Sequence, residues 1–216
     1  ILYDKVIAPR FANSQAISPD EIDKEGTVII AGVGRFGGVI NRILLGAGHN
    51  TVVLDHHAEH LERLRVFGLK VFYGDATRPD LLHAAGIDKA KMLVVAIDDK
   101  AQSLELVRYV SKNYPQVVIV ARAIDRHHVY ELWDAGSREI IRDTFDSAVR
   151  AGRTALESLG HHAYDAECET RNYVRSDRSA LRELADLYDS KILPHENLPY
   201  VNRMKELMAI QEQFIQ

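Results

Sequence analysis

Short apolar runs recur along the chain from residue 27, and each is followed by a segment with the length of a helix. The runs are continuous rather than alternating, which predicts strands that are buried on both faces of a parallel sheet. Strands are predicted at 27–33, 51–55, 70–75, 91–98, 116–123 and 138–143, and helices at 35–47, 58–68, 78–86, 99–113 and 126–135. This alternation predicts an α/β fold with a Rossmann-like, doubly wound, six-stranded parallel sheet.

The pattern changes after residue 143. An apolar stripe at helical spacing predicts a helix over 145–159, with Thr144 placed to cap it and Gly160 placed to end it. The next segment, 161–179, is polar and is predicted to be irregular, and two more helices are predicted at 180–191 and 200–215. The chain is therefore divided into an N-terminal segment with a polar linker (1–26), a Rossmann domain (27–143) and a C-terminal helical extension (144–216).

Three glycines form a G-x-G-x-x-G motif between the first predicted strand and the first predicted helix. Gly32 allows the tight turn, Gly34 lets a phosphate approach the backbone, and Gly37 lets helix and strand pack closely. Asp55 ends the second strand, where a carboxylate can accept hydrogen bonds from both ribose hydroxyls and would repel a 2′-phosphate. The motif predicts a nucleotide site, and the alternative is that the glycines serve only a tight turn.

The other predicted nucleotide contacts lie at the carboxyl ends of the strands, where open α/β sheets bind ligands. Asp75 and Asp98 have an alternative role, because each could merely cap the turn that follows it. The full set of predicted contacts is Gly32, Val33, Gly34, Arg35, Phe36, Gly37, Asp55, His56, Gly74, Asp75, Ala76, Ala96, Ile97 and Asp98.

Composition limits the partners and the chemistry. The formal net charge of −4 gives no overall basic field for nucleic acid. One cysteine, Cys168, excludes an internal disulfide and fits a reducing compartment. His56 and His60 share a helical face, but no third metal ligand such as cysteine flanks them, so no metal site is predicted.

The sequence lacks a catalytic pair for hydride transfer. No Tyr-x-x-x-Lys motif occurs, because Tyr109 is followed by Lys112 and Tyr188 by Lys191. No general acid can therefore be assigned, and a nucleotide site without one favours sensing over catalysis. A small NAD-dependent oxidoreductase is kept as the alternative function.

Several stretches make the family recognisable: VIIAGVGRFGGVINRILL, VVLDHHAEHLERLRVFGLKVFYGDATRPDLLHAAGI, VVAIDD and IIRDTFDSAVRAGRTALESLG. They closely resemble the cytoplasmic domain of bacterial Kef glutathione-gated potassium-efflux proteins, a regulatory domain of the KTN/RCK class. The resemblance covers about residues 27–165. It implies a regulator rather than an enzyme, placed on the cytoplasmic face of the bacterial inner membrane.

The resemblance also implies ligands and partners. AMP or NAD(H) would occupy the Rossmann cleft, glutathione would hold the efflux path closed, and glutathione adducts of electrophiles would open it. The domain would form a homodimer through the helix at 145–159, although the apolar face of this helix would equally suit packing on its own domain. A transmembrane potassium/proton antiporter domain would precede residue 1, and a quinone-reductase-like subunit could bind as an ancillary partner. The KTN regulator of another potassium channel or transporter is a further alternative.

Four residues match the glutathione contacts that the resemblance implies: Arg42, Phe67, Arg142 and Asp177. Arginines bind carboxylates bidentately, and a phenyl ring can face the bulky group of an adduct. The alternatives are a solvated helix face for Arg42, core packing for Phe67, and for Arg142 an ion pair with a local acid such as Asp143. The family has asparagine where Asp177 stands, with Asn172 five residues away, so the fourth contact is open between these two. An aspartate would repel a glutathione carboxylate but could hold its ammonium group.

Overall fold

Six parallel strands form one sheet in the order β3-β2-β1-β4-β5-β6. The structure is a computed structural model that describes residues 27–56 and 71–213. The strands are β1 (Val28–Ala31), β2 (Thr51–Asp55), β3 (Val71–Tyr73), β4 (Met92–Val95), β5 (Val118–Ala123) and β6 (Glu139–Arg142). The prediction of a six-stranded, doubly wound parallel sheet is confirmed.

The helices of the sheet region follow the predicted alternation. They are α2 (Arg35–Gly46), α4 (Pro79–Ala84), the short 3-10 helix η2 (Ile87–Lys89), α5 (Lys100–Asn113) and α6 (Arg126–Asp134). Local signals explain where two of them begin. Pro79 stands in the first turn of α4, where its missing N–H costs nothing, and the carboxylate of Asp125 caps α6 by accepting from the His128 N–H at 2.9 Å. The helix predicted at 58–68 lies outside the described residues.

The chain divides into two compact units, which are described separately below. The first holds the chain up to Ile97 together with Tyr114–Val118, and the second holds Asp98–Asn113 together with the chain from Ile119. The core of the first unit consists of strand residues such as Ile29, Ile30 and Leu54, which are almost completely buried. Burial of each such side chain contributes about 1.5–3 kcal/mol to folding.

The C-terminal extension is helical, but its boundaries differ from the prediction. It consists of α7 (Phe145–Ser158), α8 (Ala163–Ala185) and α9 (Leu198–Gln213). The prediction of irregular structure at 161–179 was wrong, and the predicted helix at 180–191 overlaps only the last turns of α8 and extends past its end at Ala185. A narrow buried stripe of Ala166, Ala180 and Leu184 explains α8, because a long polar helix needs only one packed edge.

The predicted cap of α7 was also wrong. Thr144 stands at the N-cap position, but its φ is 63° and its side chain makes no capping hydrogen bond. Its carbonyl oxygen instead accepts from the N–H of Ala148 and the hydroxyl of Ser147. A capping residue ordinarily has an extended backbone, and the left-handed backbone of Thr144 departs from that conformation.

Helices α8 and α9 pack on α6 within the second unit. Tyr130 of α6, Leu184 of α8 and Tyr200 of α9 form a buried cluster. The rings of Tyr130 and Tyr188 lie 4.9 Å apart between centroids. Burial is the main reason that the pKa of Tyr188 rises to about 12, with the nearby Glu131 adding to it. This aromatic packing attaches the C-terminal helices to the sheet region of their own unit.

Candidate functional site

The turn between β1 and α2 requires two of its glycines for steric reasons. Gly32 has a φ of +92°, and a Cβ there would lie 2.8 Å from the carbonyl oxygen of Ala96. A Cβ on Gly37 would clash with the carbonyl oxygen of Gly32. The backbone therefore approaches itself closely at both positions, and any side chain would force the strand and the helix apart.

Gly34 differs from these two glycines, because a Cβ there would meet nothing within 4 Å. Gly34 is exposed and stands at the N-cap of α2, where no side chain makes a capping hydrogen bond and no acid occupies the first turn. The N-terminus of a helix carries partial positive charge and N–H donors. The open space at Gly34 therefore lies where an anion can reach the N-terminus of α2.

The ends of β2 and β3 join this turn through hydrogen bonds. The carboxylate of Asp55 is buried and accepts from the Val33 N–H at 2.8 Å. The N–H of Gly32 donates to Leu54, and the N–H of Gly74 donates to the carbonyl of Asp55. Asp55 thus fixes the glycine loop, a role that sequence reasoning missed, and its contact with a ribose stays a prediction.

Asp75 makes a local turn. Its Oδ1 atom accepts from the N–H of Thr77 at 2.9 Å and from the Thr77 hydroxyl at 2.8 Å. This is the turn-capping role that the sequence left open for Asp75. Among the other predicted contacts, Arg35 and His56 are exposed and Phe36 is half-buried, while Val33, Gly37, Gly74, Ala76, Ala96 and Ile97 are buried.

Asp98 lies in the second unit, where it belongs to an ion-pair network. Arg122 donates to Asp98 and to Asp143, at 2.6 Å each. Burial alone would lower the pKa of Arg122, but the bonds to Asp143 and Asp98 outweigh it and raise the pKa. Asp98 is 84% exposed and takes part through this surface bond, so its contact with a nucleotide stays a prediction.

Two of the four residues matched to glutathione lie together. The carboxylate of Asp177 is 3% exposed and pairs with both Arg142 and Arg126, the latter at 2.5 Å. The guanidinium of Arg142 also lies 3.6 Å from the ring centroid of Phe145. Arg42 is exposed on α2, and Phe67 lies outside the described residues.

Sequence reasoning did not find Arg126. It stands at the start of α6, 51 positions before Asp177, and only the folded chain brings the two together. A buried aspartate is stable when charged partners neutralise it, and here two guanidinium groups do so. Asn172, the alternative to Asp177, is exposed on α8.

Other candidate features are weak in the described parts of the chain. Within residues 27–56 and 71–213, no group of three or more His, Cys, Asp or Glu side chains could hold a metal ion. Over the same residues no helix has the length and hydropathy needed to span a membrane. Cys168 is half-buried and forms no disulfide with a described residue.

Comparison with protein families decides the identity. The TrkA-N domain model matches residues 28–143, and the model of the potassium efflux system KefB C-terminal domain matches residues 147–216. The chain belongs to the TrkA-N family. Its second part belongs to the KefB C-terminal family, so that the two matches together define a Kef-type regulatory domain.

Curated relatives agree with this assignment. The glutathione-regulated potassium-efflux system protein KefC of Cronobacter sakazakii is 53% identical over 153 residues, which is 70% of this chain. The KefC of an Escherichia coli O17:K52:H18 strain is 46% identical over 175 residues, 81% of this chain. The chain spans about a quarter of the length of these relatives, 25% and 28%. Both family models and these relatives belong to potassium-efflux and TrkA-N systems, which confirms the expectation of a regulatory domain rather than an enzyme.

A solved structure shares both the fold and the sequence. The Kef C-terminal domain of Shewanella denitrificans, solved in an AMP-bound form, is 44% identical with a TM-score of 0.68, over 75% of this chain and 99% of that one. The TrkA-N domain of the Escherichia coli inner membrane protein ybaL is 25% identical with a TM-score of 0.54. These matches place the glycine loop of this chain in a fold that carries AMP in a relative.

Proposed function

We propose that this domain binds an adenine nucleotide at the β1–α2 turn and gates a potassium/proton efflux antiporter in response to glutathione. The observation that carries the nucleotide part is the open, uncapped N-terminus of α2 at Gly34. A phosphate there would receive backbone N–H groups and the favourable end of the helix dipole. The AMP-bound relative, 44% identical, supports this ligand, and NAD(H) shares the same adenosine phosphate.

The gating ligand is proposed to be glutathione, with its electrophile adducts as the opening signal. Curated relatives carry the description glutathione-regulated. In this chain Arg142 pairs with Asp177, so a glutathione carboxylate that bound Arg142 would share its guanidinium group with the carboxylate of Asp177 or replace that carboxylate. Gating then needs glutathione and its adducts to bind two arrangements of the domain with different affinities.

The partners are proposals of the same kind. Helix α7 has no buried residue although one of its faces is apolar, and Leu159 just beyond it is 80% exposed. A homodimer through α7 would cover this face. The membrane antiporter domain, a position on the cytoplasmic face of the inner membrane and a quinone-reductase-like ancillary subunit complete the proposal.

Thermal melting of this chain with AMP, NADH, glutathione and a bulky S-substituted glutathione tests the proposal, because selective binding to the folded state raises the melting temperature. We expect each ligand class to stabilise the chain. Gly34→Val should abolish the response to nucleotide alone, because the valine side chain fills the open space at the end of α2. Arg142→Ala should abolish the response to glutathione alone.

A structural similarity supports one alternative function, the regulation of another potassium channel. The RCK domain of GsuK is 25% identical to this chain with a TM-score of 0.56, which fits the regulator of another potassium channel. Stabilisation by nucleotide without any response to glutathione would favour that function. A melting temperature that none of the four ligands changes would contradict the proposal as a whole.

A further inference from the structure

A cleft between α7 and α8 has a composition unlike that of the rest of the chain. Its volume is about 420 Å³, within the range of small-molecule sites. The arginines that line it are Arg150, Arg153, Arg171, Arg175 and Arg178. Five arginines against two acids make this surface basic in a chain whose net charge is −4.

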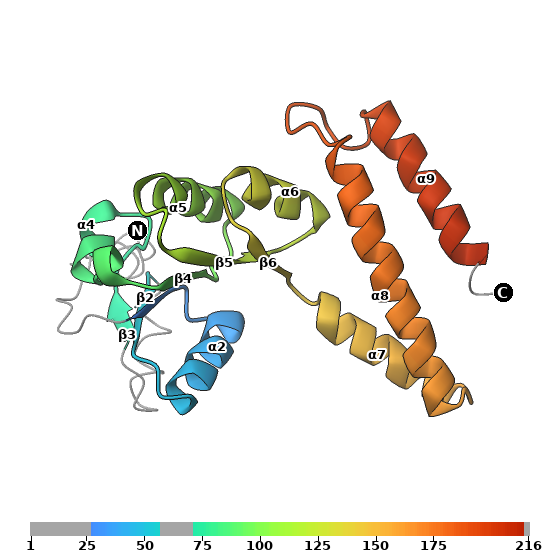
Figure 1. Cartoon of the computed structure of the whole chain (residues 1–216), viewed down its shortest axis with the longest axis horizontal. Helices are drawn as coiled ribbons and strands as arrows, with labels where there is room; N and C mark the ends of the chain where they lie inside the picture. Colours follow the sequence, from blue (N-terminus) through green and yellow to red (C-terminus); the bar gives the residue numbers. More distant parts are fainter. Residues whose placement is uncertain (1–26, 57–70, 214–216) are drawn as a thin grey trace, which may run out of the picture. The chain divides into compact units, whose positions relative to one another are not determined.

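Helical spacing produces this concentration of charge. On α7 the lining residues recur at intervals of three and four, and on α8 the same spacing places Arg171, Arg175 and Arg178 along one face. The two helices are joined by a short turn and lie against each other (Figure 1). Side chains that are far apart in sequence therefore meet across one cleft.

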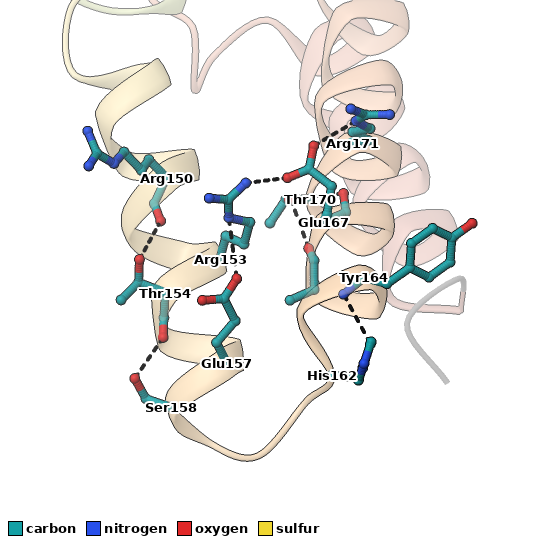
Figure 2. Close-up of polar contacts among 11 residues, drawn as sticks. Arg150, Arg153, Thr154, Glu157, Ser158, His162, Tyr164, Glu167, Thr170 and Arg171 are labelled. Carbon is teal, nitrogen blue, oxygen red and sulfur yellow. Dashed lines mark hydrogen bonds and ion pairs between the residues drawn. The ribbon is translucent and has the colours of Figure 1, made fainter.

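One end of the cleft is held by ion pairs. Glu167 of α8 accepts from Arg153 of α7 and from Arg171 of α8, the latter at 2.7 Å (Figure 2). These bonds from Arg153 and Arg171 outweigh partial desolvation and lower the pKa of Glu167. Two of the five guanidinium groups thus have a carboxylate partner, and the bond between Arg153 and Glu167 joins the two helices.

The other three arginines lack such a partner. The side chains of Arg150, Arg175 and Arg178 make no hydrogen bond or ion pair with any described residue. Like charges placed around one cleft repel each other, and solvent screening and the two lining acids reduce this cost. An anion in the cleft would remove this repulsion, and guanidinium groups bind phosphate oxygens with matched geometry.

We propose that the α7–α8 cleft is a binding site for a small phosphate-bearing polyanion, separate from the nucleotide site at Gly34 and from the residues matched to glutathione. Arg150, Arg175 and Arg178 would contact the phosphate groups, and the Arg153–Glu167–Arg171 network would keep the cleft open. The phosphate could come from a free metabolite or from a lipid headgroup. The chemistry is shared, and the experiment separates the two sources.

The test compares two single-charge variants of the whole chain. Arg175→Gln removes a lining arginine, while Arg182→Gln removes an exposed arginine of the same helix that does not line the cleft. Both side chains are exposed, so both variants should melt at the wild-type temperature without ligand. Inorganic pyrophosphate is titrated into each by calorimetry, and sedimentation with phosphatidylglycerol vesicles, against phosphatidylcholine vesicles, measures lipid binding.

We expect Arg175→Gln to weaken pyrophosphate binding at least tenfold and Arg182→Gln to weaken it less than twofold. If vesicle binding alone shows this difference between the variants, the site takes a lipid headgroup. The proposal is overturned if neither probe binds the wild-type chain, or if Arg182→Gln loses as much binding as Arg175→Gln. Pyrophosphate binding that Gly34→Val abolishes would also overturn it, because the anion would then occupy the end of α2.

Discussion

The β1–α2 turn and helix α8 present positive charge by different means. At the turn, the charge is the partial charge of backbone N–H groups, and glycines make room for it. On α8 and its neighbours, the charge belongs to arginine side chains, some paired and some not. No Cβ atom can be added at Gly37 without displacing the backbone, whereas a surface arginine can be substituted without a change in the fold. The two regions should therefore respond differently to mutation.

The largest effect is expected where α8 buries a charge. Asp177→Ala leaves Arg126 and Arg142 in a partly buried place without their carboxylate. Breaking a buried ion pair by removing one partner costs about 3–5 kcal/mol. Urea unfolding followed by circular dichroism should show this loss in the free energy of unfolding.

Asp186→Ala is the matched control, because Asp186 is exposed at the end of the same helix. It should change stability by less than about 0.5 kcal/mol. The stability of Asp177→Asn should lie between those of Asp177→Ala and Asp186→Ala, since the amide oxygen can still accept one hydrogen bond from a guanidinium group. Equal stability of Asp177→Ala and the wild type would show that the arginines do not depend on this carboxylate.

The next largest effect is expected at the turn. Gly37→Ala places a methyl group against the carbonyl oxygen of Gly32, and this backbone atom cannot rotate away as a side chain could. Overpacking of this kind costs about 1–3 kcal/mol. Because the added methyl group forces β1 and α2 apart, calorimetry should show no binding of AMP to this variant. A Gly37→Ala chain that binds AMP with wild-type affinity would refute the close approach of strand and helix.

A smaller effect concerns pH. His128 is completely buried, its Nδ1 accepts from the Ile124 N–H at 3.2 Å, and burial lowers its pKa below the ordinary value of about 6.5. Below pH 6.5 the unfolded chain therefore takes up a proton that the folded chain resists. Stability contributed by the neutral imidazole is complete above pH 6.5 and declines as the pH falls towards the lowered pKa.

Melting curves between pH 7.5 and 5 test this prediction. His128→Gln keeps an acceptor for the Ile124 N–H but cannot titrate, so its melting temperature should fall less on acidification than that of the wild type. His195→Gln is the control, because it removes an exposed histidine instead of a buried one. Parallel curves for the wild type and His128→Gln would contradict the burial argument.

The sequence revealed the turn more completely than it revealed α8, for a physical reason. Strands buried on both faces must be continuously apolar, and a glycine motif is local, so both are visible along the chain. In α8 the buried edge includes an aspartate, Asp177, whose partner Arg126 is 51 positions away. A polar residue at a buried position interrupts the apolar periodicity, which is why 161–179 was predicted to be irregular. The lining of the α7–α8 cleft was missed for the same reason.

The smallest expected effect again uses a glycine, now in a helix. A Cβ on Gly152 of α7 would meet nothing within 4 Å of the chain. Gly152→Ala should therefore stabilise the chain by about 0.5–1 kcal/mol, the difference in helix propensity between the two residues. Because the proposed homodimer uses α7, the same methyl group would separate two copies that approach closely at Gly152. Thermal melting should then show a gain at low concentration, while sedimentation velocity shows a weaker dimer. If the variant gains both thermal stability and dimer affinity, Gly152 lies outside the dimer contact. A less stable monomer would contradict the open space around Gly152.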